Sequence, residues 1–336
     1  MLYCENLEKK VFERPSSIQV DNFSVVSGYL SPEPIKELES LPHDVHATVI
    51  YGMYGKDGIK EPLHKALVNL HQSLPNVEIL YCTVPVHSKI YFWNKGAQIA
   101  SALIGSANFS VSGLRNDLKE VLYDVDEKSF DEFEAYYKQV REKCILCTDK
   151  SVKVRVVEKI KRTNVAQETL LAKNICRASF LDNKGLIPKK SGLNWCFSRG
   201  NVSRGDAYIP ISMKDVRMYP QMFPPKKYVE GIENPNAVGK KKRDNDQIEL
   251  IWDDGKRMIG LLEGQVKRKS DGLIFPKNLA SSPQKSILGI YLRERIGVSL
   301  DKVITKKDLI KYGRTHIDIS LIGDGVYYMD FSVNKK

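Results

Sequence analysis

One stretch of the chain, residues 86–108, constrains the fold more than any other. Residues 90–93, Ile-Tyr-Phe-Trp, are β-branched and aromatic, a composition that favours a strand. The Asn-Lys-Gly sequence at residues 94–96 is a turn signal, and residues 100–104 have the apolar character of a second strand. The sequence therefore predicts a β-hairpin whose open ends carry four polar side chains: His87, Lys89, Ser106 and Asn108.

These four side chains suit the chemistry of a phosphate. His87 and Lys89 are one residue apart, a spacing that places both side chains on the same face of a strand. Lys89 would supply positive charge, and Ser106 and Asn108 would donate hydrogen bonds. His87 then remains as a nucleophile or proton carrier. A lone His-x-Lys is usually structural, but its pairing with Gly-Ser-x-Asn favours a functional site.

The pattern resembles the signature of the phospholipase D superfamily, His-x-Lys followed by Gly-Ser-x-Asn. The resemblance implies a pair of facing motifs: one histidine attacks phosphorus, and the other protonates the leaving oxygen and then activates water. It also implies that Glu120 orients His87. The chain departs from the longer signature at Asn94, where the superfamily has an aspartate that is usually considered structural.

The chain contains a single His-x-Lys motif, so the second motif must come from another chain. We therefore expect a homodimer with His87, Lys89 and Asn108 of both subunits in one composite site. The paired lysines and donors would neutralise the phosphate, so we expect no cofactor and no divalent metal. ATP would act only through a separate ATPase or translocase subunit, with which some relatives work.

The charge is distributed unevenly. Residues 1–150 hold 16 basic and 21 acidic side chains, whereas residues 151–336 hold 36 and 20. The second half therefore carries a net charge of +16 within a chain of +11. Such an excess of Lys and Arg is typical of proteins that bind a polyanion, since phosphate contacts release counterions. It favours double-stranded DNA as the partner over a merely basic domain.

Length and patterning suggest two domains. Strands and helices alternate over residues 1–150, which predicts an α/β domain with a mixed sheet. Residues 151–174 are charged and have the character of a linker. Residues 175–336 combine strands with turn signals and predict a β-rich domain, as a small barrel. The helix expected at residues 286–296 would end at Gly297.

Two polar loops in the second half suit the reading of base edges, because Arg pairs with guanine, Asn with adenine and Asp with the amino group of cytosine. A basic run at residues 240–243 is a further candidate for phosphate contact. The predicted DNA contacts are Asn194, Trp195, Arg199, Asn201, Arg204 and Asp206 in the first loop and Lys267, Arg268 and Lys269 in the second.

The second half also resembles a known domain. Gly-Leu-Asn-Trp, Ala-Tyr-Ile-Pro-Ile, Tyr-Gly-Arg-Thr and Tyr-Tyr-Met-Asp-Phe-Ser are similar to the carboxyl-terminal domain of the NgoFVII/NgoAVII-type restriction endonucleases, relatives of BfiI. The resemblance covers nearly the whole chain. It implies a phospholipase D-like nuclease domain joined to a B3-like pseudobarrel, and metal-independent DNA cleavage at or near a short recognised sequence.

Two other functions remain open at this point. The same motif serves phosphodiesterases that act on lipid, although the basic half argues against a lipid substrate. A non-catalytic DNA-binding subunit is the third possibility, which the complete His/Lys/Asn set opposes. The sequence does not specify the recognised bases, the cleavage position or the protective methylation.

Cysteine usage and apolar runs bear on location. The six cysteines show no disulfide framework, and Cys144 and Cys147 lack a second pair for zinc, so we expect no metal site. The amino-terminus has no signal-peptide pattern, and no apolar run is long enough for a membrane span. We therefore expect a cytoplasmic protein that does not bind membranes.

Overall fold

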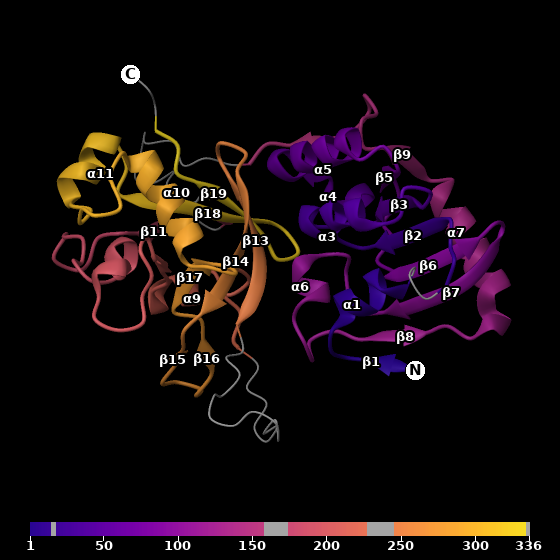
Figure 1. Ribbon diagram of the computed structural model, residues 1–336, viewed down its shortest axis with the longest axis horizontal. Coiled ribbons are helices and arrows are strands. Elements are labelled where there is room, and N and C mark those ends of the chain that lie inside the picture. The colour runs from indigo at the N-terminus through magenta and orange to yellow at the C-terminus, as the bar shows by residue number, and fades with distance from the viewer. Residues whose placement is uncertain (15–17, 158–173, 227–244, 334–336) are drawn as a thin grey trace. The chain divides into compact units, whose positions relative to one another are not determined.

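The computed structural model describes residues 1–14, 18–157, 174–226 and 245–333. They form two compact units: Met1–Val157 together with Ile322–Val326 belong to the first, and the other described residues belong to the second (Figure 1). Residues 165–171, whose composition favours a helix, and the basic run at residues 240–243 lie outside the described residues. None of the described helices is long and apolar enough to cross a membrane.

The first unit is built on an eight-stranded mixed sheet with the order β1-β8-β7-β6-β2-β3-β5-β9. The strands β2, β3 and β5 are parallel, while β6 and β7 form the antiparallel hairpin that the sequence predicted. The strands are β1 (Leu2–Tyr3), β2 (Asn22–Ser27), β3 (His46–Tyr51), β5 (Val77–Cys82), β6 (Ile90–Lys95), β7 (Gln98–Gly105), β8 (Leu122–Asp124) and β9 (Cys144–Leu146).

Helices cover this sheet because its strands are apolar on both faces. Alternation along β6 directs Phe92 to one face, where it contacts Phe133 and Tyr137 of α7. Trp93 points to the opposite face and stacks on Phe23 of β2. The helices are α1 (Leu7–Phe12), α3 (Pro32–Glu37), η1 (Leu38–Ser40), α4 (Tyr54–Asp57), α5 (Glu61–Ser73), α6 (Val111–Leu114), η2 (Glu127–Ser129) and α7 (Phe130–Arg141), and a small pair joins β4 (Ile59–Lys60) to β10 (Val154–Arg155).

The second unit is built on a seven-stranded sheet with the order β11-β18-β19-β13-β14-β17-β12. Its two edge strands approach each other, so the sheet nearly closes into a barrel around one apolar core. This is the β-rich architecture that the sequence predicted. The strands are β11 (Cys176–Ser179), β12 (Ile209–Pro210), β13 (Asp246–Trp252), β14 (Arg257–Glu263), β17 (Asn278–Ser281), β18 (His316–Gly323) and β19 (Val326–Asp330).

Helices and a short hairpin complete this unit. α10 (Ser286–Ile296) ends at Gly297, whose φ of 78° is the left-handed conformation expected of a helix-terminating glycine. A hairpin of β15 (Val266–Lys267) and β16 (Ile274–Phe275) projects from the barrel at the end opposite α11 (Figure 1). The remaining helices are η4 (Gly192–Phe197), α9 (Met213–Met218) and α11 (Lys306–Tyr312).

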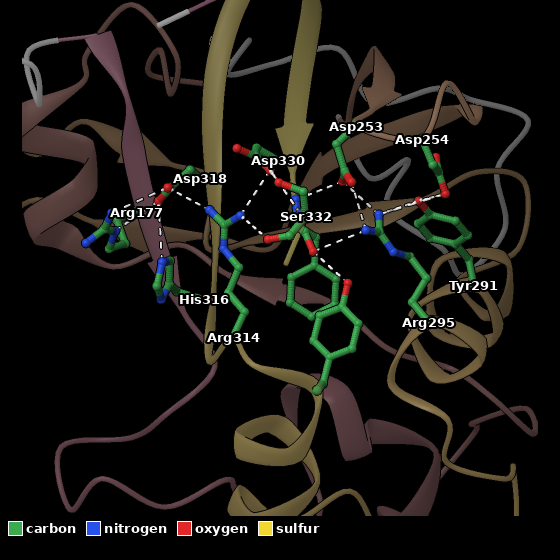
Figure 2. Close-up of polar contacts among 12 residues, drawn as sticks. Arg177, Asp253, Asp254, Tyr291, Arg295, Arg314, His316, Asp318, Asp330 and Ser332 are labelled. Atoms are coloured by element: carbon green, nitrogen blue, oxygen red, sulfur yellow. Dashed lines mark hydrogen bonds and ion pairs between the residues drawn. The ribbon is translucent and has the colours of Figure 1, made fainter. Parts of the chain in front are cut away.

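An ionic network crosses the interior of the second unit (Figure 2). Arg314 donates to Asp318 on β18 at 2.6 Å and to Asp330 on β19 at 3.0 Å. Farther along the same sheet, Arg295 of α10 pairs with Asp253, which follows β13. Buried charges are tolerated only when they are paired and hydrogen-bonded: here Arg314 joins the neighbouring strands β18 and β19, and Arg295 joins α10 to the end of β13.

Candidate active site

The polar residues that precede β6 lie at the end of the sheet where β2 also terminates. Strand β2 runs antiparallel to β6, with Val26 opposite Ile90. The chain that leaves β2 at Ser27 therefore passes beside His87 and Lys89, which lie in an extended segment just before β6. The sequence placed these two residues within the strand, and the structure corrects that boundary.

His87 and Lys89 form a close pair despite their different exposure. His87 is exposed, whereas Lys89 is only 7% exposed. The Lys89 ammonium lies 3.1 Å from Nδ1 and 3.2 Å from Nε2 of the His87 ring, and it donates to the His87 carbonyl at 2.7 Å. The two side chains lie side by side although neither residue belongs to a strand, and a buried cation lies beside an accessible imidazole.

Asn108 reaches the same place from the far end of the hairpin. Its Oδ1 accepts a hydrogen bond from the backbone N–H of Tyr29 at 3.2 Å and from the hydroxyl of Ser27 at 3.4 Å. A β-carbon built on Gly28 would lie 3.3 Å from Asn108 Oδ1 and 2.8 Å from Cδ2 of His87. The chain after β2 therefore supports both residues, and Gly28 leaves the space that they occupy.

Tyr29 adds an aromatic wall that the sequence analysis did not predict. Its ring meets the His87 ring edge-to-face, with centroids 5.9 Å apart, and its hydroxyl donates to Asp57 at 2.9 Å. Burial, reinforced by Asp57, raises the pKa of Tyr29 to about 12, so the phenol stays neutral. Residues 23–29 have the composition of a strand, but only the pairing of β2 with β6 shows that the residues just after β2 border the site.

Ser106 and Glu120 lie on the side of the site that leads to β8. The hydroxyl of Ser106 accepts a hydrogen bond from the backbone N–H of Val121 at 3.0 Å, so it ties β7 to the segment that carries Glu120. Within the described residues, no hydrogen bond or ion pair joins Glu120 to His87. Glu120 acts instead on Lys89: burial lowers the pKa of Lys89 below its ordinary value, and the negative charge of Glu120 opposes that shift.

The first predicted DNA loop contains two residues that point inward. Asn194 is fully buried; its Nδ2 donates to the carbonyl of Ile304 at 2.8 Å, and its Oδ1 accepts from the N–H of the same residue at 2.8 Å. Asp206 is 8% exposed and accepts from the backbone N–H of Ser203 at 2.7 Å. Both residues organise the loop from within, which corrects the prediction that they contact DNA.

The other predicted residues of this loop are accessible. Arg199, Asn201 and Arg204 are exposed. Trp195 is half-buried, between Tyr208 at 5.6 Å and the ammonium of Lys285 at 4.7 Å from the ring centroid. The loop thus presents two guanidinium groups and one amide on a framework held by buried contacts.

The second predicted loop is the β15–β16 hairpin. Lys267, the last residue of β15, and Lys269, in the turn that follows, are exposed. Arg268 is partly exposed: Asp271 holds its guanidinium with a contact of 2.8 Å from Nε to Oδ2, and the guanidinium lies 4.6 Å from the ring centroid of Phe275. Three basic side chains therefore share one short, ordered turn.

Comparison with known proteins gives a consistent result across the chain. The model of the NgoFVII restriction endonuclease N-terminal PLD domain matches residues 5–154. The model of the NgoFVII C-terminal B3-like DNA-binding domain matches residues 170–323. No curated protein matches the chain.

Three solved structures show weaker likeness to less than half of the chain. NucT from Helicobacter pylori is 16% identical, with a TM-score of 0.32 over 44% of this chain and 97% of NucT. Polyphosphate kinase from Porphyromonas gingivalis is 16% identical, with a TM-score of 0.31 over 49% of this chain and 25% of the kinase. Phosphatidylserine synthase from Haemophilus influenzae is 13% identical, with a TM-score of 0.29 over 46% and 39% of the two chains.

The two family models agree with the two folds: a phospholipase D-like α/β unit that carries the His87 site, and a B3-like unit with a nearly closed sheet and basic loops. Together they span most of the chain. The protein belongs to the NgoFVII restriction endonuclease family and is a site-specific deoxyribonuclease that binds DNA through its B3-like domain.

Proposed function

We propose that this nuclease cleaves DNA without a divalent metal, through a covalent phosphohistidine on His87. The observation that carries the proposal is the position of Lys89, a buried ammonium within 3.2 Å of both ring nitrogens of an exposed imidazole. A fixed cation can stabilise the charge that develops on the phosphoryl oxygens during attack. It thereby takes the part that a metal ion plays in many other nucleases.

The reaction has two displacements at phosphorus. A neutral His87 nitrogen attacks the scissile phosphate, a P–N bond forms and the P–O bond to the leaving strand breaks. A second histidine, in its protonated form, gives a proton to that leaving oxygen. The same histidine, now neutral, takes a proton from water; the resulting hydroxide attacks phosphorus, the P–N bond breaks and His87 is released.

The second histidine would be His87 of another subunit. The motif occurs once in the chain, and the mechanism needs two histidines on opposite sides of one phosphorus. A homodimer with the two sites facing across its two-fold axis meets that need. In this arrangement each composite site holds two copies of Lys89 and Asn108.

The other residues of the site would bind the phosphate or hold the binding residues in place. Asn108 is fixed by its Oδ1 contacts with Tyr29 and Ser27, and its Nδ2 donates to Asp324 at 2.8 Å; as a phosphate ligand, this amide would exchange the carboxylate for a phosphate oxygen. Ser106 holds the chain near Val121 in place. Glu120 favours the charged form of Lys89, in addition to the role in orienting His87 that the resemblance to the superfamily implies.

DNA recognition would use the two basic loops of the second unit. The accessible residues Arg199, Asn201 and Arg204 in the first loop and Lys267, Arg268 and Lys269 in the second are the proposed contacts, with Trp195 packed beside them. Arginine and asparagine suit base edges, and the lysines suit phosphates. An ATPase or translocase subunit, where it takes part, would control access of DNA to the same chemistry.

The test is cleavage of mixed plasmid DNA in EDTA by the wild type, by His87→Ala and by a matched control. His43→Ala is the control, since His43 is also exposed and precedes β3, at the opposite end of the sheet from the site. We expect discrete fragments from the wild type and from His43→Ala but none from His87→Ala, with DNA binding retained in all three. Cleavage that requires added magnesium would overturn the phosphohistidine mechanism, and hydrolysis of lipid without DNA cleavage would overturn the substrate.

The composite site has its own test. When wild-type and His87→Ala chains assemble at random, the fraction of dimers with two intact copies of His87 equals the square of the wild-type fraction. A 1:1 mixture should therefore retain about a quarter of the activity if each site needs both subunits. Activity of about half would show that each subunit cleaves with a site of its own, and about three quarters would show that one intact His87 suffices in a shared site.

A further inference from the structure

The β15–β16 hairpin contains one acidic residue among its basic ones. Asp271 lies at the tip, three residues after Arg268, and is 36% exposed at its side chain. An uncompensated carboxylate would repel the phosphates that Lys267 and Lys269 are expected to contact. Asp271 is fully engaged instead, so its presence calls for a role in placing its partner.

The Arg268–Asp271 pair is bidentate and side-on. The Arg268 Nε lies 3.0 Å from Oδ1 and 2.8 Å from Oδ2 of Asp271, and Nη2 also donates to Oδ2. A guanidinium has five N–H donors in a rigid plane. The side-on pair uses the Nε edge, so the opposite edge, formed by the outer N–H bonds of Nη1 and Nη2, points away from Asp271.

One further contact supports the guanidinium, and another holds the backbone of Arg268. It lies over the ring of Phe275, 4.6 Å from the centroid, and Phe275 is itself 2% exposed and anchored in the core. The backbone N–H of Arg268 donates to the carbonyl of Leu273 at 2.8 Å. Arg268 is thus held at its backbone by Leu273, at the Nε edge of its guanidinium by Asp271 and at one face of the guanidinium by Phe275.

Asp271 also shapes the turn, and this second role can be separated from the first. Its Oδ1 accepts a hydrogen bond from the backbone N–H of Leu273 at 3.1 Å, next to Gly272 with its φ of 74°. An asparagine at this position keeps an oxygen for that hydrogen bond but loses the charge. Asp271→Asn therefore weakens the hold on Arg268 while preserving the turn, whereas Asp271→Ala removes both contacts.

We propose that Asp271 is a positioning residue for sequence recognition: it presents the outer edge of Arg268 to O6 and N7 of one guanine. An end-on arginine pairs with these two atoms in a bidentate manner, the commonest specific contact in the major groove. Exposed ion pairs add little stability, so orientation, rather than folding, is the consequence of this one. The inference rests on the proposed function, in which this hairpin contacts DNA.

The experiment is selection of bound duplexes from a pool with a randomised 12-base-pair centre, with each bound pool sequenced. The full-length chains compared are the wild type, Arg268→Ala, Asp271→Asn and Lys269→Ala. We expect the wild type to select a motif that has guanine at one position. Arg268→Ala and Asp271→Asn should both lose the base preference at that position and keep the preferences at the other positions. Lys269→Ala should weaken binding to all sequences alike.

Affinity for the selected duplex supplies the second measurement. Arg268→Ala should weaken it about 10-fold or more, and Asp271→Asn a few-fold, with melting temperatures equal to the wild type. If Arg268→Ala loses the base preference at one position and Asp271→Asn keeps it, the role of Asp271 is overturned while the contact of Arg268 with DNA stands. If the two variants lose base preference at different positions of the motif, Asp271 itself contacts a base, which overturns the positioning role. If Arg268→Ala changes nothing, or the wild type selects no motif, the proposed contact fails and the inference fails with it.

Discussion

Gly28 lies directly against the imidazole of His87: a β-carbon on Gly28 would come within 2.8 Å of Cδ2. The atom that it would displace belongs to an exposed side chain that can swing away. Gly28→Ala should therefore change the position of the proposed nucleophile without a large cost in stability.

We predict that Gly28→Ala lowers kcat by about 100-fold, the usual effect of a displacement of about 1 Å in a reacting group. Single-turnover cleavage and a melting curve measure the two effects separately. DNA binding should equal that of the wild type. A variant with normal kcat would show that His87 does not use the orientation seen beside Gly28.

Glu120 is expected to set the alkaline limit of activity. Burial lowers the pKa of Lys89, and Glu120 raises it again by favouring the charged form. Loss of the Lys89 proton should therefore give a fall in cleavage at high pH with an apparent pKa below that of an ordinary lysine, in addition to the fall caused when the general-acid histidine loses its proton. Glu120→Gln removes the opposing charge, so the alkaline limb should move further toward lower pH.

The measurement is kcat/KM against pH, which reports ionisations of the free enzyme. Glu120→Asp, which keeps the charge, is the matched control and should retain more of the wild-type profile. An alkaline limb that stays in place in Glu120→Gln would show that Glu120 does not act through Lys89.

Asn194 and Arg199 lie close in sequence but should differ in effect. Asn194 makes buried hydrogen bonds with Ile304, so Asn194→Ala leaves buried backbone groups unpaired and should cost about 1–3 kcal/mol of stability. Arg199 is exposed, so Arg199→Ala should leave the melting temperature unchanged and weaken DNA binding. Thermal melting and duplex titration of both variants test the assignment, and unchanged stability of Asn194→Ala would contradict it.

The ionic network of the second unit predicts a large stability effect at Arg314 (Figure 2). The side chains of Arg314 and Asp318 are 7% and 8% exposed, and Asp330 completes the group at 10%. Arg314→Ala removes one of the two arginines that pair with Asp318 and takes the Arg314 guanidinium away from Asp330, so it should cost about 3–5 kcal/mol.

Urea denaturation measures this loss, with Lys65→Ala as the control. Lys65 pairs with Glu61 across an exposed turn of α5, and such pairs contribute about 0.5 kcal/mol or less. Equal midpoints for Arg314→Ala and Lys65→Ala would mean that the interior network contributes no more than a surface pair.

Local patterns in the sequence predicted much of the fold. The β-branched and aromatic run at residues 90–93 and the turn signal at residues 94–96 predicted the β6–β7 hairpin, because strand propensity and turn chemistry are properties of neighbouring residues. The end of α10 at Gly297 followed in the same way. The paired motif predicted His87, Lys89 and Asn108 as one cluster, and the resemblance to known families predicted the two domain types.

By itself, then, the sequence determined the elements, their polarity and the residues available for phosphate chemistry. Only the tertiary structure decided which side chains remain available. Asn194 looked like a base reader, yet Ile304, which lies 110 residues farther along the chain, encloses its amide. Gly28 and Tyr29 carried no motif, and they reach His87 only because β2 pairs with β6. Burial and hydrogen-bond pairing depend on contacts between distant segments, and local sequence patterns do not specify those contacts.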